Sequence, residues 1–221
     1  MGAAIYFRYF YFSFRNLPAA RLIPAQLADT TASAAPGEAL SYLGYEFEVP
    51  WGDADASNAK ASGNVAIIPF RSGLTIAFLI HSPREFVDQM TKSGSVRREQ
   101  LCEMYGNSAC ESEYAFKRLM FEASPAKLRL FMPRVQNARL SYLLLLKSAA
   151  VREISGLFLI DTEEYHGFQF GDVATARGEI VDELYGNDTH LEFVFGRKDR
   201  KPLGISQPEI NRVLQTVHRK R

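Results

Sequence analysis

Two pairs of β-type runs joined by short turns restrict the fold of this chain more than any other feature. Residues 64–70 and 74–80 are rich in Val and Ile, and a short segment ending in Gly73 joins them. Residues 178–185 and 190–196 flank a Gly-Asn-Asp turn, in which Gly and Asn tolerate positive φ. Strands joined by so few residues must run antiparallel. The sequence therefore predicts a sheet that is built mainly from hairpins.

Other stretches carry similar patterns. Tyr45, Phe47 and Val49 alternate with polar positions, which is the period of a half-buried strand. Residues 155–161 and 167–171 form a third pair of runs, here around an acidic turn. Together with the helices indicated below, these runs predict an α+β fold. We expect an antiparallel sheet of about six to seven strands, covered by helices in a single layered domain.

Serines that precede an acidic residue by three positions predict helix starts, because the two side chains satisfy free amide groups at a helix N-terminus. The pattern occurs at Ser82, Ser108 and Ser206, and Ser124 is followed by proline alone. Residues 143–146 are four consecutive leucines, so we expect their helix to be the most buried. The last helix should lie flat on the sheet, with an apolar stripe of Ile210, Val213, Leu214 and Val217.

The chain divides into three predicted segments. Residues 1–16 are an aromatic N-terminal segment, and residues 17–38 are an Ala/Pro/Thr-rich linker. Residues 39–221 then form one α+β domain, since a chain of 221 residues that is 47% hydrophobic can bury a substantial core.

The apolar segment between Ile5 and Phe14 needs a partner surface. It is too short to span a membrane, which takes about 20 apolar residues. Its Tyr and Phe residues would suit a membrane interface, as an anchor. Alternatively, the segment packs on the protein's own core or on a second copy in a homo-oligomer. The first alternative predicts a membrane-associated or extracytoplasmic protein.

Charge and motifs argue against several functions. The net charge is +1, which supplies no overall field to hold a nucleic acid. The basic clusters at residues 196–202 and 218–221 are interpreted as a solvated loop and as cations at a helix C-terminus. The chain has no GxSxG elbow, no HExxH pair and no glycine-rich phosphate loop. We therefore expect no nucleic-acid partner, no cofactor and no metal.

The two cysteines, Cys102 and Cys110, do not have the spacing of a zinc ribbon or of a thioredoxin-type site. In one interpretation both are small buried hydrophobic residues, as free cysteines often are. In the other, a disulfide closes a short loop between two helices in an oxidising compartment. We favour the first interpretation, because cysteine is commonly buried and the geometry of the loop is open.

An acidic turn contains most of the candidate site residues, which are Asp161, Glu163, Glu164 and His166. Charged turn residues are usually exposed, and we favour that interpretation. The alternative is an enzyme with an unfamiliar site here, for which Glu163 and His166 are the first candidates. His81, at the end of a predicted strand, is another candidate. A hydrogen-bonded histidine at a strand end is the commoner case.

The stretches GYEFEVPW and EINRVLQTVH, with the order of elements between them, resemble PsbP-like α/β/α sandwich proteins. The resemblance implies a noncatalytic accessory or binding module, and it carries over no site residue. The long helical region in the middle of the chain departs from that pattern. Our expected function is a noncatalytic accessory or binding domain that is tethered by its N-terminal segment and takes an unknown protein or small-molecule partner.

Overall fold

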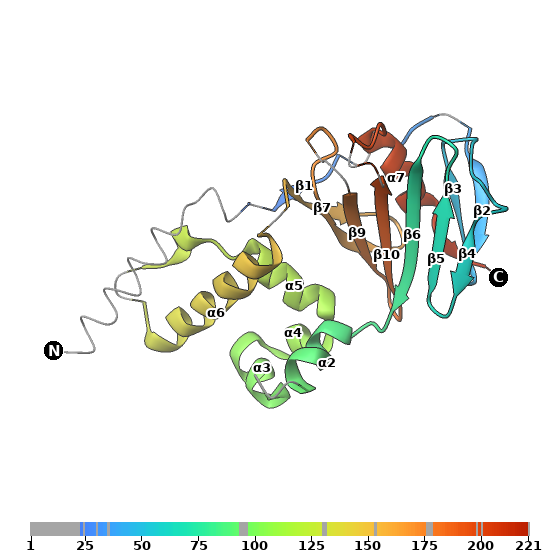
Figure 1. Cartoon of the computed structure of the whole chain (residues 1–221). Coiled ribbons are helices and arrows are strands. Elements are labelled where there is room, and N and C mark those ends of the chain that lie inside the picture. Colours follow the sequence, from blue (N-terminus) through green and yellow to red (C-terminus); the bar gives the residue numbers. More distant parts are fainter. Residues whose placement is uncertain are drawn as a thin grey trace. The chain divides into compact units, whose positions relative to one another are not determined.

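The computed structural model describes residues 23, 25–29, 31–34, 36–92, 97–129, 132–152, 154–175, 179–197, 199 and 201–220. The chain divides into two compact units (Figure 1). One unit comprises Met1–Ala25 and Arg84–Ile154, and the other comprises Gln26–Pro83 and Ser155–Arg221. The expected single domain over residues 39–221 stays a prediction, and within this range the middle of the chain forms a compact helical unit. The predicted segment 1–16 lies outside the described residues.

The unit with Gln26–Pro83 and Ser155–Arg221, called the sheet unit below, contains a large sheet. The predicted hairpins are confirmed, and seven strands pair antiparallel as expected. The short strand β1 joins β7 in parallel at the edge. In spatial order the strands are β1 (Gln26–Leu27), β7 (Leu157–Asp161), β8 (His166–Phe170), β9 (Glu179–Tyr185), β10 (His190–Arg197), β6 (Leu74–His81), β5 (Val65–Pro69) and β4 (Lys60–Ser62).

A smaller sheet and one helix complete the core of the sheet unit. The small sheet has the order β11 (His218–Arg219), β3 (Tyr45–Val49) and β2 (Glu38–Tyr42). Between the sheets, the ring of Phe47 lies 5.5 Å from that of Phe78 and 5.2 Å from that of Phe193. Such aromatic contacts add to the area burial that holds the two layers together.

Helix α7 (Gln207–Thr216) packs against β3, as its apolar stripe predicts. Its residues Ile210, Val213 and Leu214 are buried in the same core. The predicted capping box is confirmed, because Ser206 accepts from the backbone of the third helical residue and Glu209 accepts from the Ser206 amide. Glu209 also accepts a hydrogen bond from the indole of Trp51 at 3.0 Å, which links the helix start to the sheet.

The described part of the predicted linker is attached to the sheet unit. The Ala28 amide donates to the Leu159 carbonyl at 2.9 Å, which extends the pairing of β1. The Asn211 side chain donates to the carbonyls of Asp29 and Thr31. The described backbone groups of this segment thus find partners that a sequence pattern does not reveal.

The helical unit contains α2 (Glu85–Lys92), α3 (Arg98–Tyr105), α4 (Asn107–Glu111), α5 (Glu113–Glu122), the 3-10 turn η2 (Pro125–Lys127) and α6 (Arg134–Ala150). Ser124 caps η2 as predicted. Ser108, however, lies inside α4, and Ser112 is the residue that caps α5 by accepting from the Ala115 amide. No helix among these described residues has both the length and the apolar character to cross a membrane.

The prediction that the leucine-rich helix is the most buried one is wrong. Within α6, Leu145 is 57% exposed, whereas Lys147 is only 3% exposed. The burial follows helical periodicity rather than the leucine run, because Lys147 shares a face with the buried Leu143 and Leu144.

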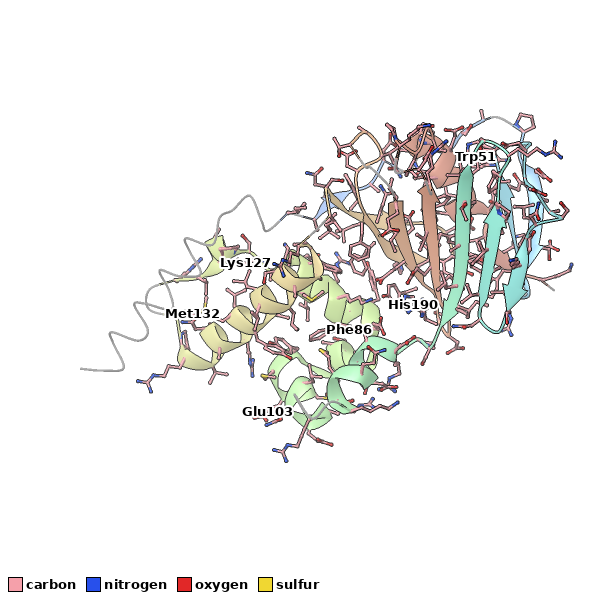
Figure 2. All side chains as sticks on the ribbon, in the orientation of Figure 1. Trp51, Phe86, Glu103, Lys127, Met132 and His190 are labelled. Carbon is pink, nitrogen blue, oxygen red and sulfur yellow. A yellow bond between two sulfur atoms is a disulfide. The ribbon has the colours of Figure 1, made fainter. Side chains whose placement is uncertain are left out.

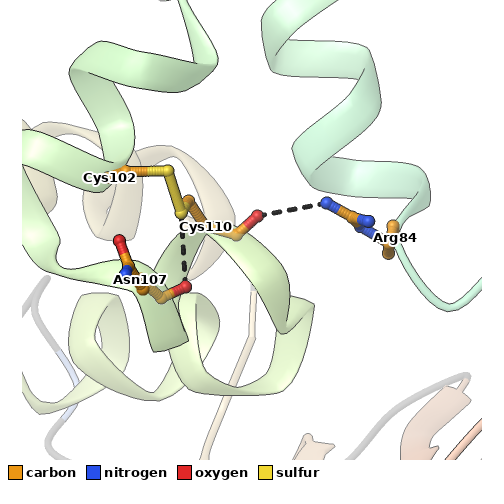
Figure 3. Close-up of a disulfide and its surroundings, with 4 residues drawn as sticks. All are labelled: Arg84, Cys102, Asn107 and Cys110. Atoms are coloured by element: carbon orange, nitrogen blue, oxygen red, sulfur yellow. Dashed lines mark hydrogen bonds between the residues drawn. A yellow bond between two sulfur atoms is a disulfide. The ribbon is translucent and has the colours of Figure 1, made fainter.

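Cys102 and Cys110 form a disulfide that joins α3 to α4 (Figure 3). The favoured interpretation, two free buried cysteines, is therefore wrong. The Cα atoms lie 5.1 Å apart, within the range that a disulfide spans. Gly106 between the helices has φ 89°, a conformation that glycine adopts without strain and that turns the chain back on itself. The Arg84 guanidinium donates to the Cys110 carbonyl at 3.4 Å.

Candidate functional site

A row of polar and aromatic side chains crosses five strands of the large sheet. Directly opposite residues in antiparallel strands lie on the same face of a sheet. The register therefore places the row in the order Asp161, His166, Tyr185, His190 and His81. Their chain neighbours point into the core, so the row occupies the opposite face. Figure 2 labels His190, which lies on β10 between Tyr185 on β9 and His81 on β6.

Several contacts orient the row between β9 and β6. His81 Nε2 lies 3.0 Å from a carboxylate oxygen of Glu192. The Tyr185 hydroxyl donates to Glu183 at 2.8 Å. The His190 ring lies between the two pairs, with its centroid 4.8 Å from that of His81 and 4.3 Å from that of Tyr185. Imidazole, phenol and carboxylate groups of this kind can exchange protons with a bound molecule.

The structure separates the three candidates from the sequence. His166 contacts Asp161 at 2.8 Å, and these side chains are 59% and 72% exposed. Glu163 is an exposed residue of the turn before β8. His81 lies on the same face as His166 but three strands away, which corresponds to about 14 Å. The three groups therefore do not converge, and among the described residues no three His, Cys, Asp or Glu could hold a metal.

Described cations in both basic clusters are paired with acids, namely Arg197, Lys201 and Lys220. Asp199 contacts Arg197 at 3.2 Å and Lys201 at 3.3 Å, and the hydrogen bond from Arg197 lowers the pKa of Asp199 to about 2. Glu46 contacts Lys220 at 3.2 Å. These pairs satisfy the cations locally, as the interpretation of solvated charges expects.

A cavity of about 310 Å³ in the helical unit brings together a different set of groups. Its size is at the lower end of pockets that hold small molecules. Its charged and hydroxyl-bearing lining comes from the end of α5, from η2 and from α6. The lining residues are Ala25, Phe121, Glu122, Ala123, Ser124, Pro125, Lys127 and Lys147.

Lys147 is the buried cation of this cavity. Its ammonium group donates to the carbonyl of Phe121 and, at 3.0 Å, to the carbonyl of Ala123. These carbonyls are at the C-terminal end of α5, where the helix dipole favours a positive charge. Desolvation by burial, together with the nearby charge of Lys127, lowers the pKa of Lys147 from 10.5 to about 8.

Lys127 is the second amine of the cavity (labelled in Figure 2). It donates to the Glu122 carbonyl at 3.1 Å. The Glu122 carboxylate is engaged by Arg118 at 2.8 Å. Among the described residues, neither lysine has a carboxylate within ion-pair distance. The cavity thus has two cationic groups and room for a small anion.

No protein-family model, no curated protein and no solved structure matches this chain. The resemblance to PsbP-like proteins therefore stays a prediction.

Sequence reasoning missed both lysines and the middle of the row, although signals for Lys147 and for the middle of the row were present. Lys147 is three and four positions after Leu144 and Leu143, so helical spacing places it on their face. Tyr185 and His190 flank the predicted hairpin turn, so the hairpin register pairs them. What no pattern supplies is the cavity, because it depends on how α5, η2 and α6 pack.

Proposed function

We propose that this protein is a noncatalytic binding protein that takes a small anionic molecule into the cavity beside Lys147 and Lys127. One observation carries the proposal: a lysine that is only 3% exposed lines a cavity of about 310 Å³ next to a second lysine. Neither amine has an acidic partner among the described residues.

The physical argument is the cost of an unpaired buried charge. A charge removed from water is costly unless an opposite charge or hydrogen bonds compensate it. The two carbonyls compensate Lys147 only in part, because the pKa of its ammonium group is still lowered to about 8. An anion beside Lys127 would balance the charge of that amine and remove its repulsion of Lys147.

The disulfide is an indication of the compartment in which the protein acts. Bonds of this kind persist in oxidising environments and are rare in a reducing cytosol. The Cys102–Cys110 bond therefore supports our proposal that the protein acts in an extracytoplasmic compartment. The tether that we propose for its N-terminal segment lies outside the described residues and stays a prediction.

Binding can be tested on the full chain. Native mass spectrometry of protein purified from its own host should show a bound small molecule, and calorimetric titrations with lactate and with inorganic phosphate should give measurable binding of at least one of them. We expect Lys147→Met to weaken that binding at least tenfold, which is about 1.4 kcal/mol.

The matched control is Lys60→Met, which removes an exposed lysine from β4 in the sheet unit. It should bind as the wild type does. Equal binding by wild type and Lys147→Met would contradict the proposal, and so would the absence of any ligand from both experiments.

A second candidate function is an enzyme that uses the row on the sheet. The observation in its favour is the pair of oriented contacts, His81 with Glu192 and Tyr185 with Glu183. If this function is the correct one, His81→Gln and Glu192→Gln should abolish turnover of a substrate found by activity screening, while lactate and phosphate binding remains as in the wild type.

A further inference from the structure

We propose that the ligand of the cavity is a small aldehyde or ketone with an anionic group, and that the Lys147 amine holds it as an imine. This inference rests on the proposed binding of an anion in the same cavity. It adds the chemical class of the ligand and a covalent bond to a named atom, Nζ of Lys147.

The hydrogen bonds of Lys147 suit a nucleophilic amine. Its nitrogen is bonded to the side-chain carbon and donates two hydrogens, one to the Phe121 carbonyl and one to the Ala123 carbonyl. A nitrogen with tetrahedral geometry has one further position. In the charged form this position holds the third hydrogen, and in the neutral form it holds the lone pair. Loss of one proton therefore leaves both hydrogen bonds in place and frees the electron pair that attacks a carbonyl carbon.

The surroundings of Lys147 increase the fraction of its amine that is neutral. Burial and the charge of Lys127 lower its pKa from 10.5 to about 8. At neutral pH the neutral fraction is then about 300-fold larger than that of an ordinary lysine. Desolvation and a neighbouring cation are the two devices that activate lysine for imine formation in proteins.

The reaction balances without a further reagent. The Lys147 ammonium first loses one proton to solvent. The neutral nitrogen then forms a bond to the carbonyl carbon and gives one of its hydrogens to the carbonyl oxygen, which yields a carbinolamine. The carbinolamine hydroxyl takes up a proton from solvent and leaves as water, and the carbon–nitrogen double bond forms. The product is a protonated imine, whose one remaining N–H can donate to the Phe121 or the Ala123 carbonyl, so one of the two hydrogen bonds is given up. The net change is one ammonium group and one carbonyl compound to one protonated imine and one water.

Lys127 gives the cavity its preference for an anionic carbonyl compound. Its ammonium group lines the same space and is anchored by one hydrogen bond, at 3.1 Å, to the Glu122 carbonyl. An ammonium group has three donors, so with respect to the described residues two of them are available to a carboxylate or a phosphate. Lys127 is thus a binding residue, whereas Lys147 forms the covalent bond.

The test uses pyruvate and lactate, which have the same carboxylate but differ in that one is a ketone and the other an alcohol. The full chain is incubated with pyruvate and sodium cyanoborohydride, which reduces an imine to a stable secondary amine. Mass spectrometry of the intact chain and of its peptides should then find one adduct, located on Lys147 and at least tenfold more abundant there than on any other lysine. Lactate should bind without an adduct and should protect Lys147.

Two variants and one measurement on the wild type separate the possible outcomes. Lys147→Arg keeps the positive charge and should lose the adduct, whereas Lys60→Arg should label as the wild type does. The labelling rate of the unaltered protein should rise with pH and level off above about 8, as the pKa of Lys147 requires. This profile needs no variant, so a misfolded Lys147→Arg would not weaken the test.

Suppose that lactate binds, but that pyruvate gives no adduct or labels exposed lysines as strongly as it labels Lys147. The proposed imine is then wrong, and the proposed anion binding still holds. If neither compound binds or reacts, both the imine and the binding of small carboxylates are wrong.

Discussion

Asp182 lies directly opposite Phe193 on the core face of the large sheet. Its side chain is fully buried, and neither carboxyl oxygen has a hydrogen-bond partner among the described residues. On its other side the register places Gln169, whose amide donates to the Gly171 carbonyl and to Gln207. Desolvation by burial therefore raises the pKa of Asp182 well above its ordinary value of 3.8.

The buried carboxyl should make the stability of the protein depend on pH. Above about pH 4 the unfolded chain releases the Asp182 proton, while the folded chain keeps it until the pH reaches the raised pKa. The free energy of unfolding should therefore fall as the pH rises through this window, by about 1.4 kcal/mol per pH unit from this group. Urea unfolding from pH 5 to pH 8 measures the slope.

Asp182→Asn removes the titrating group, so the contribution of this group to the pH dependence of the free energy of unfolding should disappear. The control is Asp188→Asn, which changes an exposed residue in the turn between β9 and β10 and should keep the wild-type slope. A wild-type and an Asp182→Asn protein with the same dependence on pH would contradict a protonated Asp182 in the core.

Gly167 is required by the close approach of β8 to β9. A Cβ atom at this position would lie 2.0 Å from the backbone oxygen of Glu183, which no side-chain movement can relieve. We expect Gly167→Ala to lower the free energy of unfolding by about 3 kcal/mol, the upper part of the usual range for overpacking. Thermal and urea unfolding measure the loss. Gly52→Ala should change little, because nothing lies within 4 Å of a Cβ there.

The Cys102–Cys110 disulfide should stabilise the helical unit. It closes a loop with a sequence separation of 8, for which the chain-entropy model gives about 2.5 kcal/mol. We expect reduction, or the double change Cys102→Ser with Cys110→Ser, to lower the unfolding temperature of the helical unit more than that of the sheet unit. Calorimetry with and without a reductant measures this. Free thiols in protein from its own host would contradict both the bond and the proposed oxidising compartment.

The N-terminal tether is tested by deletion. If the segment between Ile5 and Phe14 anchors the protein, the full chain should fractionate with membranes or as larger assemblies, and a chain without residues 1–37 should not. Both forms are expressed in the same cells and compared by fractionation and size-exclusion chromatography. Equal solubility and equal mass of the two forms would show that the segment is neither an anchor nor an oligomerisation arm.

Much of the sheet was predictable because its signals are local. The alternation of Leu191, Phe193 and Phe195 with the residues between them, and the turn before His190, determine a strand, its face and its hairpin partner within a few residues. The same holds for Ser206 and Glu209 at the start of α7. The strand β4 was missed, because its three residues are all exposed and have no apolar period.

The candidate site was predictable only in part. His81 and His166 were identified as candidates, and the structure places them on one face without bringing them together. Lys147 was missed because lysine is almost never buried. A run of leucines next to a lysine suggests that the leucines are buried and the lysine is exposed, whereas in α6 the exposure of Leu145 and Lys147 is reversed. Leu145 is 57% exposed and Lys147 is 3% exposed.

The sequence by itself determined the α+β class, the hairpins and the caps at Ser124 and Ser206, because each depends mainly on residues close together in the chain. Only the tertiary structure decided the division into two units, the bond between Cys102 and Cys110, and the burial of Asp182 and Lys147. The division and the burial depend on which distant elements pack together, and the bond depends on how the chain turns at Gly106 between α3 and α4. Water is excluded from a side chain by all of its neighbours at once, and the period of its own helix or strand specifies only the direction in which it points.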